Sequence, residues 1–236
     1  MIKLHAERTL EARVKLYYSL HTPAETPAPL LIALHGYGDN KNWMMREARE
    51  IAPDGFAIAA LQGFHQHMKE PKDTGGTPVY SYGYGFGWLT NFRPEDSIAL
   101  HHGALLDMIG QLSDEGVADK SRVFLLGFSQ TCALNYRFAF THAEILRGVA
   151  GICGGLPGDW ETSERYRHTE AAVLHLAGAR DEYYPPARTA DYAARLALRA
   201  REVEFKSYDA AHELNAAMRE DLRAWLTTHA ARDFDK

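Results

Sequence analysis

The stretch VFLLGFSQT, residues 123–131, guides the interpretation of the whole chain. An apolar run leads into Gly-Phe-Ser-Gln-Thr, and a helical pattern follows at once over residues 130–141. This order of strand, tight turn and helix is typical of a nucleophile elbow, in which the turn lifts a serine above the sheet in a strained conformation. Gly127 leaves room for the chain to reverse, and the free N–H groups of the helix can stabilise an oxyanion. We therefore expect Ser129 to be a nucleophile, with an ordinary N-cap serine as the alternative.

Apolar runs of the same kind recur along the chain and alternate with helical patterns. Further strands are expected at residues 10–20, 30–35, 56–61, 148–153, 172–178 and, nearer an edge, 202–208. Helices are expected at residues 42–52, from Pro94 to Leu112, and at 130–141, 186–200 and 213–229. This alternation predicts an α/β fold with a mostly parallel central sheet and helices on both faces. Because we find no internal repeat and no linker, we expect residues 1–236 to form a single domain.

The composition excludes several classes of protein. Hydrophobic residues make up 46% of the chain and aromatic residues 11%, which excludes a disordered protein. No apolar run approaches the ~20 residues of a membrane span, and the start, MIKLHAERTL, has no apolar region of the kind found in signal peptides. The net charge of −5 comes from scattered residues, which argues against a nucleic-acid groove. Cys132 and Cys153 lie in apolar surroundings and are expected to be buried free thiols, which favours a cytoplasmic protein.

Residues 63–93 break the alternation, because they contain neither a good helical pattern nor a buried strand. A structureless segment of this length in a compact domain is usually functional or disordered. Disordered segments are poor in aromatic residues, and this one is rich in them, so we expect an ordered loop or lid. Two compatible interpretations remain: a local strand that buries its aromatic face, or a wall that contacts a substrate. The candidate substrate-contacting residues alternate with glycine and are Tyr82, Tyr84, Phe86 and Trp88.

A nucleophilic serine needs a base, and the base needs an acid that orients it. In chains with a nucleophile elbow the acid follows the serine, and a histidine follows the acid. Asp181 comes directly after the apolar run 172–178, and His212 comes after the run 202–208. Catalytic groups gather at the carboxyl ends of strands in open α/β sheets. We therefore expect Asp181 and His212 to act with Ser129. The neighbouring Glu182 is the alternative acid.

Other polar residues are interpreted as structural. Asp209 is more typical of a turn, and His175, inside an apolar run, of a hydrogen-bonded core histidine. His101 and His102 lie on a predicted helix, where packing or exposure explains them. His65 and His67 are two positions apart in the irregular segment without a clear carboxylate or cysteine set, so we expect no metal site.

The second half of an oxyanion hole should come from the loop after residues 30–35. That loop reads His35-Gly36-Tyr37-Gly38, and its glycines allow the backbone to approach a reacting carbonyl closely. We expect the backbone N–H groups of Tyr37 and Gln130 to hold the oxyanion. A plain glycine turn is the alternative. His35 is expected to have a structural, hydrogen-bonding role.

These motifs together resemble the phospholipase/carboxylesterase family of α/β-hydrolases, to which bacterial predicted esterases and acyl-protein thioesterases belong. The resemblance runs from about residue 28 to about residue 228 and is carried by LHGYGD (34–39), GFSQT (127–131), GGLP (154–157), AGARDEYYP (177–185) and AAH (210–212). Gln62-Gly63 resembles the P-x-G that follows the next strand in the family. Carried over by position, the resemblance implies an α/β-hydrolase fold with these roles: Tyr37 and Gln130 as oxyanion donors, Ser129 as nucleophile, Asp181 as acid and His212 as base.

The sequence departs from the family pattern at three points. Thr131 stands where the elbow usually has glycine, Ala211 stands where glycine usually precedes the base, and the aromatic–glycine segment is not a strong family signature. The resemblance implies a cofactor-free serine hydrolase that cleaves small-molecule carboxylic esters or thioesters through an acyl-enzyme, and it leaves a homodimer open. A peptidase on the same fold and a non-catalytic ligand-binding homologue are the alternatives.

Overall fold

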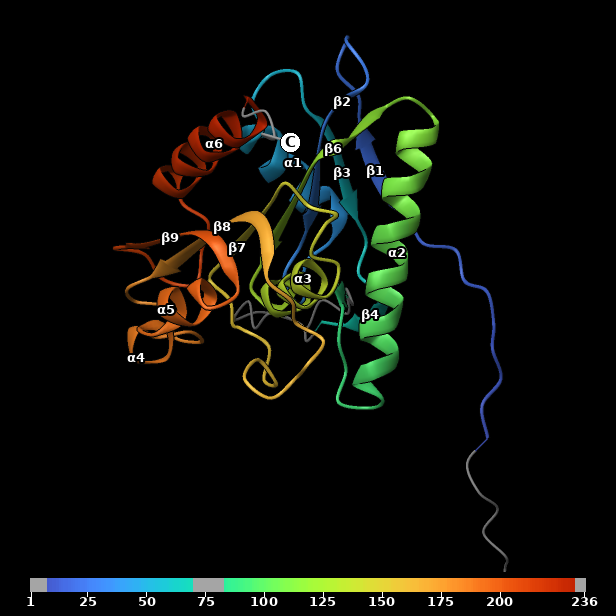
Figure 1. The fold of residues 1–236 in the computed structure, drawn as a ribbon. Helices are drawn as coiled ribbons and strands as arrows, with labels where there is room; N and C mark the ends of the chain where they lie inside the picture. Colours follow the sequence, from blue (N-terminus) through green and yellow to red (C-terminus); the bar gives the residue numbers. More distant parts are fainter. Residues whose placement is uncertain (1–7, 70–82, 232–236) are drawn as a thin grey trace, which may run out of the picture.

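The structure, a computed structural model, describes residues 8–69 and 83–231. Within them a seven-stranded sheet lies at the centre, with the strand order β1-β3-β2-β6-β7-β8-β9 (Figure 1). Its strands are β1 (Tyr18–His21), β2 (Ala28–Leu34), β3 (Ala57–Leu61), β6 (Ala118–Phe128), β7 (Gly148–Ile152), β8 (Thr169–Gly178) and β9 (Ala200–Tyr208). β1 is antiparallel to β3, and every other neighbouring pair is parallel. The predicted mostly parallel sheet is therefore confirmed, and β9 lies at an edge.

Helices cover both faces of this sheet. They are α1 (Lys41–Ile51), α2 (Pro94–Asp114), α3 (Gln130–Thr141), α4 (Pro186–Thr189), α5 (Tyr192–Ala197) and α6 (Ala216–Ala231). Residues of α2, α3 and α5 belong to one apolar cluster, and residues of α1 and α6 belong to a second cluster on the other face (Figure 1). In β2, Leu30, Ile32 and Leu34 join the first cluster, whereas Leu31 and Ala33 join the second. Successive strand residues point to opposite faces, so a strand buried on both faces is a continuous apolar run.

Two predicted elements are corrected by the structure. Of residues 10–20, only the end forms β1, because the pairing with Ile58–Leu61 of the short strand β3 is continued, among the described residues, only by a bond from the N–H of Gln62 to the carbonyl of Tyr17. The predicted helix 186–200 is divided into α4 and α5. Asp191, which precedes α5, has φ −100° and ψ 0°, outside the usual helical values, and the chain turns there.

Within the segment 63–93, the described residues contain more regular secondary structure than the sequence predicts. It contains β4 (His65–Met68) and β5 (Tyr84–Gly87), which pair in an antiparallel two-stranded sheet. This agrees with a local strand, and the backbone hydrogen bonds of the pair explain how a glycine-rich segment holds its shape. Residues 70–82, with the candidate Tyr82, lie outside the described residues.

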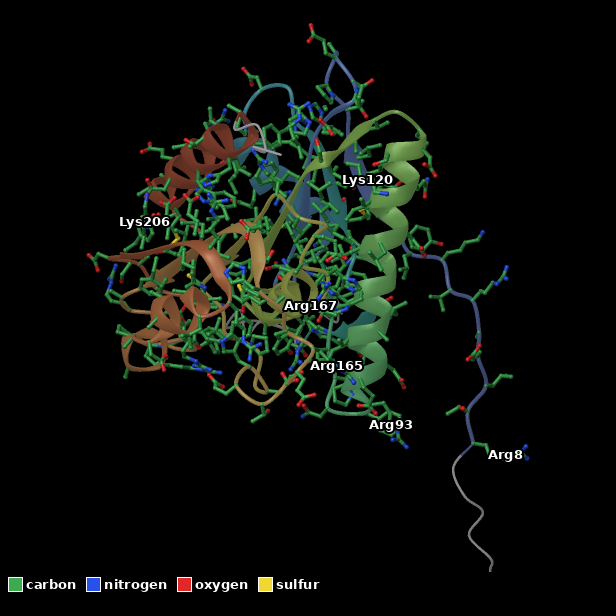
Figure 2. All side chains as sticks on the ribbon, viewed as in Figure 1. Arg8, Arg93, Lys120, Arg165, Arg167 and Lys206 are labelled. Atoms are coloured by element: carbon green, nitrogen blue, oxygen red, sulfur yellow. The ribbon has the colours of Figure 1, made fainter. Side chains whose placement is uncertain are left out.

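The surface agrees with the scattered charge of the sequence. Figure 2 shows the labelled side chains Arg8, Lys120, Arg167 and Lys206 on separate parts of the molecule. Among the helices of residues 8–69 and 83–231, none has both the length and the hydropathy that a membrane span requires.

Candidate active site

Ser129 lies in the sharp turn between β6 and α3. Its backbone has φ 57° and ψ −111°, in a region that residues other than glycine rarely adopt. The Ser129 N–H donates to the carbonyl of Ile152 at 2.8 Å. Gly127 is needed here, because a β-carbon at this position would lie 2.6 Å from Nδ2 of Asn135 and 2.9 Å from Oγ1 of Thr131. The first turns of α3 thus pack directly against the end of β6. This packing stabilises the strained backbone of Ser129.

The threonine that replaces the elbow glycine is fully buried and hydrogen-bonded. Oγ1 of Thr131 lies 3.1 Å from the carbonyl oxygen of Leu34 and 3.0 Å from that of Phe128. The hydroxyl can donate a hydrogen bond to either carbonyl, so the buried polar group of Thr131 is satisfied within the turn. The departure from the family motif is therefore accommodated by a contact between α3 and the ends of β2 and β6.

Ala211 stands where the family has a glycine before the base, and a glycine of the neighbouring strand lies next to it. A β-carbon at Gly178, the last residue of β8, would lie 2.5 Å from the carbonyl oxygen of Ala211 and 2.6 Å from that of Ala210. The close approach between these two loops is therefore provided by Gly178, and Ala211 is tolerated.

The structure brings Ser129, His212 and Asp181 together. Nε2 of His212 lies 2.9 Å from Oγ of Ser129, and Nδ1 of His212 lies 2.8 Å from Oδ2 of Asp181. The three residues follow the carboxyl ends of β6, β9 and β8, which meet at one edge of the parallel sheet. A carboxylate only accepts hydrogen bonds, so His212 carries its proton on Nδ1 and its Nε2 can accept the Ser129 hydroxyl proton.

Asp181 is fixed by hydrogen bonds on both carboxylate oxygens. Its Oδ1 accepts the N–H groups of Tyr183 at 2.8 Å and of Tyr184 at 2.9 Å, while Oδ2 faces His212. Burial raises the pKa of Asp181, but these hydrogen bonds outweigh it and hold the pKa below its usual value of 3.8. The carboxylate is therefore ionised at neutral pH. The alternative acid, Glu182, is exposed.

Aromatic rings surround the His212 imidazole. The ring centroid of His212 lies 4.8 Å from that of Tyr183, 5.1 Å from Phe128 and 6.0 Å from Tyr184. The sequence analysis did not select the two tyrosines. Their position directly after Asp181 was the signal that could have identified them, because the loop that fixes the acid also reaches its histidine partner.

The Tyr37 and Gln130 amides lie on two sides of the elbow. Gln130 is the first residue of α3, and Tyr37 lies in the loop after β2. Within the described residues, neither amide donates a hydrogen bond to a protein acceptor, which leaves both available. A β-carbon at Gly36 would lie 2.9 Å from Cδ1 of Phe128 and 3.3 Å from Cβ of Ser129. Gly36 thus permits the close approach of this loop to the serine.

His35 forms hydrogen bonds with the loop after β2, which is the structural role that the sequence predicts. It is fully buried, its Nδ1 donates to the carbonyl of Gly36 at 2.7 Å, and its Nε2 accepts the N–H of Gly63 at 3.0 Å. Burial lowers the pKa of His35 to about 4, against a smaller opposite effect of the Gly36 hydrogen bond. The neutral imidazole therefore joins the loop after β2 to the Gln62-Gly63 turn after β3 over a wide pH range.

The aromatic candidates of the segment 63–93 differ in their exposure. Tyr84 is 58% exposed and Phe86 is half-buried. Trp88 is fully buried, and its indole N–H donates to the carbonyl of His35 at 2.8 Å. We therefore correct the expectation of substrate contact for Trp88, which is a core residue. Tyr37 is 62% exposed and stacks on His67, with ring centroids 4.4 Å apart.

Four other histidines considered in the sequence lie in structural positions. His175 is buried in β8, where Nδ1 lies 2.8 Å from the Tyr136 hydroxyl and burial lowers its pKa to about 4. Nε2 of His65 lies 2.9 Å from Oγ of Ser97. On α2, Nε2 of His101 lies 3.2 Å from Oδ1 of Asn135, and Nδ1 of His102 lies 3.3 Å from Nε2 of His142.

One group of described residues has donor atoms close enough for a metal ion: Glu202, Glu204 and His229, all within 4.8 Å of one another. Nε2 of His229 already lies 3.2 Å from Oε1 of Glu202, and its Nδ1 lies 2.8 Å from the Trp225 carbonyl oxygen. Contacts with protein atoms account for this geometry. The group also lies toward the start of β9, whereas His212 follows its end.

Both cysteines are buried free thiols, as predicted. Sγ of Cys132 lies 3.3 Å from the carbonyl oxygens of Gly127 and Ile152, directly below the elbow. Burial raises the pKa of the Cys153 thiol to about 12. Neither thiol is therefore ionised at neutral pH, and both act as packing residues.

Comparisons with known proteins show the family of the chain. The model of a family described as phospholipase/carboxylesterase matches residues 17–230. NocK of Nocardia uniformis subsp. tsuyamanensis, whose name assigns it provisionally to the esterases, is 25% identical over 151 residues. That alignment covers 59% of this chain and 38% of NocK, so the chain spans well under half of that relative.

Solved structures share the fold. A carboxylesterase of Bacillus cereus superimposes with a TM-score of 0.70 at 16% identity, over 91% of this chain and 94% of the other. A carboxylesterase of Mesorhizobium loti superimposes with a TM-score of 0.70 at 20% identity, over 90% of this chain and 94% of the other. At these identities the likeness shows the fold alone.

Proposed function

Because this chain belongs to the phospholipase/carboxylesterase family of α/β-hydrolases, we propose that it is a serine hydrolase that cleaves carboxylic esters or thioesters through an acyl-enzyme. The observation that carries the proposal is the continuous hydrogen-bond chain from Ser129 through His212 to Asp181, with distances of 2.9 and 2.8 Å. The strained elbow, which points the serine hydroxyl at the imidazole, supports the same assignment.

In the acylation step, Nε2 of His212 takes the proton of the Ser129 hydroxyl while Oγ attacks the acyl carbon. The carbonyl oxygen becomes an oxyanion, which the N–H groups of Tyr37 and Gln130 stabilise. Such preorganised donors are effective because they need no reorientation as charge develops, and the loss of one typically lowers kcat by about 10²–10³. The protonated His212 then gives its proton to the leaving alcohol or thiol.

In the deacylation step, the same imidazole accepts a proton from water, and the resulting hydroxide attacks the acyl-enzyme. The proton returns to Oγ of Ser129 as the acid product leaves. Asp181 stabilises the imidazolium in both steps. Its own ionised form is favoured by the hydrogen bonds from His212 and from the amides of Tyr184 and Tyr183.

The substrate is expected to bring an apolar group next to the serine. Tyr84 and Phe86 remain candidates to contact it, and Tyr183 joins them because it is 62% exposed beside His212. Esters and thioesters present the same acyl carbon to Ser129, so the triad itself serves either class. Small-molecule esters are the first class to assay.

Turnover of a short-chain nitrophenyl ester tests the proposal. We expect Ser129→Ala to remove turnover while its circular dichroism and melting curve stay those of a folded protein. Wild-type turnover in the folded variant would contradict the assignment of Ser129. Release of amines from peptides without any turnover of esters or thioesters would instead make the chain a peptidase and contradict the substrate class.

A further inference from the structure

The strand β5 lies directly against the loop that carries Tyr37. The N–H of Gly38 donates to the carbonyl of Phe86 at 2.8 Å, and the N–H of Phe86 donates to the carbonyl of Asp39 at 3.2 Å. These two reciprocal bonds join β5 to the residues that follow Tyr37. Gly38 has φ +87°, a value that suits glycine, so the loop turns at the point where β5 holds it.

The end of the same segment holds the second oxyanion donor. The backbone N–H of Trp88 donates to Oε1 of Gln130 at 2.9 Å, and Nε2 of Gln130 donates to the carbonyl of Leu89 at 3.3 Å. The indole N–H of Trp88 also donates to the carbonyl of His35 at 2.8 Å, just before the loop of Tyr37. One short segment, residues 84–89, therefore touches both sides of the expected oxyanion hole.

A side chain would crowd this contact at two glycine positions. A β-carbon at Gly85 would lie 3.0 Å from the Cα and carbonyl oxygen of Gly38 and 2.6 Å from Nε2 of His67. A β-carbon at Gly87 would lie 3.1 Å from Cδ2 of Tyr37. At Gly83, by contrast, a β-carbon would meet only the Lys69 side chain at 3.9 Å, which is ordinary van der Waals contact.

The alternation of aromatic residues and glycine now has a physical cause. Successive residues of a strand point to opposite faces, so the glycines of β5 share one face and the aromatic residues share the other. Gly85 and Gly87 are buried, whereas Tyr84 is exposed and Phe86 half-buried. The glycine face is the one that lies against the loop after β2.

We propose that residues 84–89 are a brace that fixes the two oxyanion-hole amides, with Gly85 and Gly87 as positioning residues. This inference rests on the proposed function, since it assigns a role in the same reaction. Oxyanion stabilisation depends on donors that are held within about 0.5 Å of the productive geometry. A methyl group at position 87 would push the Tyr37 ring, and one at position 85 would push the backbone of Gly38.

The test compares Gly85→Ala and Gly87→Ala with the matched control Gly83→Ala. We expect both brace variants to lower kcat for a nitrophenyl ester at least about 10-fold with KM nearly unchanged, because the donors act in the transition state. Amide hydrogen exchange at Gly38, followed by NMR, should be faster in both. Gly83→Ala should keep the wild-type kcat and the wild-type exchange.

The outcomes separate the brace from the proposed function. Wild-type kcat and wild-type exchange at Gly38 in both brace variants would overturn the brace, while Ser129→Ala would still abolish turnover. If Ser129→Ala kept its turnover, the proposed function itself would be contradicted, whatever the glycine variants showed. If both glycine variants unfold, Trp88→Phe supplies the test, since it keeps an aromatic ring in this buried position while it removes the indole bond to His35. Lower kcat with faster Gly38 exchange in that variant supports the brace, and wild-type values of both overturn it.

Discussion

Asp181 holds His212 through Oδ2 at 2.8 Å, and the backbone of the residues that follow Asp181 in the chain holds its other oxygen. The acid is therefore fixed before a substrate arrives. Asp181→Asn keeps the size of the side chain but can present an N–H to Nδ1, which favours the wrong imidazole tautomer. We expect kcat to fall by about 10⁴. The control Glu182→Gln changes an exposed neighbour and should leave ester turnover close to the wild type. Equal effects of the two substitutions would contradict the assignment of the acid.

The buried histidines make the fold less stable in acid. His35 and His175 are fully buried, and their pKa values are lowered from 6.5 to about 4. Above pH 6.5 both are neutral in the folded and unfolded states. As the pH falls from 6.5 toward 4 only the unfolded state binds their protons, so stability is lost in that window. Urea unfolding at pH 7 and pH 5 should differ by roughly 2 kcal/mol for each histidine. His175→Gln should show a smaller difference, and an unchanged one would contradict the linkage.

Thr131 should stabilise the elbow through its hydroxyl. Thr131→Ala removes the buried hydroxyl that can donate to the carbonyl of Leu34 or to that of Phe128. The free energy of unfolding should fall by about 1–3 kcal/mol, which is the cost of an unsatisfied buried polar group. Thr131→Ser keeps the hydroxyl and should lose less. Calorimetric melting of the two variants measures this order, and greater stability of the alanine variant would contradict it.

Glycine substitutions should separate the packed elbow from a helix position that has free space beside it. Gly127→Ala would place a β-carbon 2.6 Å from Nδ2 of Asn135, so we expect a loss of stability and of ester turnover. Gly110 lies inside α2 with nothing within 4 Å of an added β-carbon. Gly110→Ala should therefore raise the free energy of unfolding by roughly 0.5–1 kcal/mol. The comparison fails if the two melting temperatures shift in the same direction.

The sheet and the closeness of the three candidate triad residues could be predicted from the sequence because both depend on local patterns. Strands buried on both faces are continuous apolar runs, and the polar residues that follow them are brought to one edge by parallel topology. Ser129, Asp181 and His212 could be identified in this way although 83 positions separate the first from the last.

The predictions fail where a residue's position depends on contacts with residues that are far away in the sequence. Residues 10–17 alternate like a strand, but their pairing with the segment of β3 ends at the bond between Gln62 and Tyr17. The burial of Trp88 depends on the carbonyl of His35, which is 53 residues away in the chain. The glycines of β5 are explained only by their contact with the loop around Gly38, which no local pattern indicates.

The mass of the protein after incubation with a fluorophosphonate is the most direct measure of the central claim. The reagent reacts with a serine only where a base and an oxyanion hole activate it. We predict one covalent adduct per chain, mapped to the peptide that contains Ser129, and its absence in Ser129→Ala and His212→Ala. An unmodified wild-type protein, or an adduct that persists in Ser129→Ala, would contradict the account.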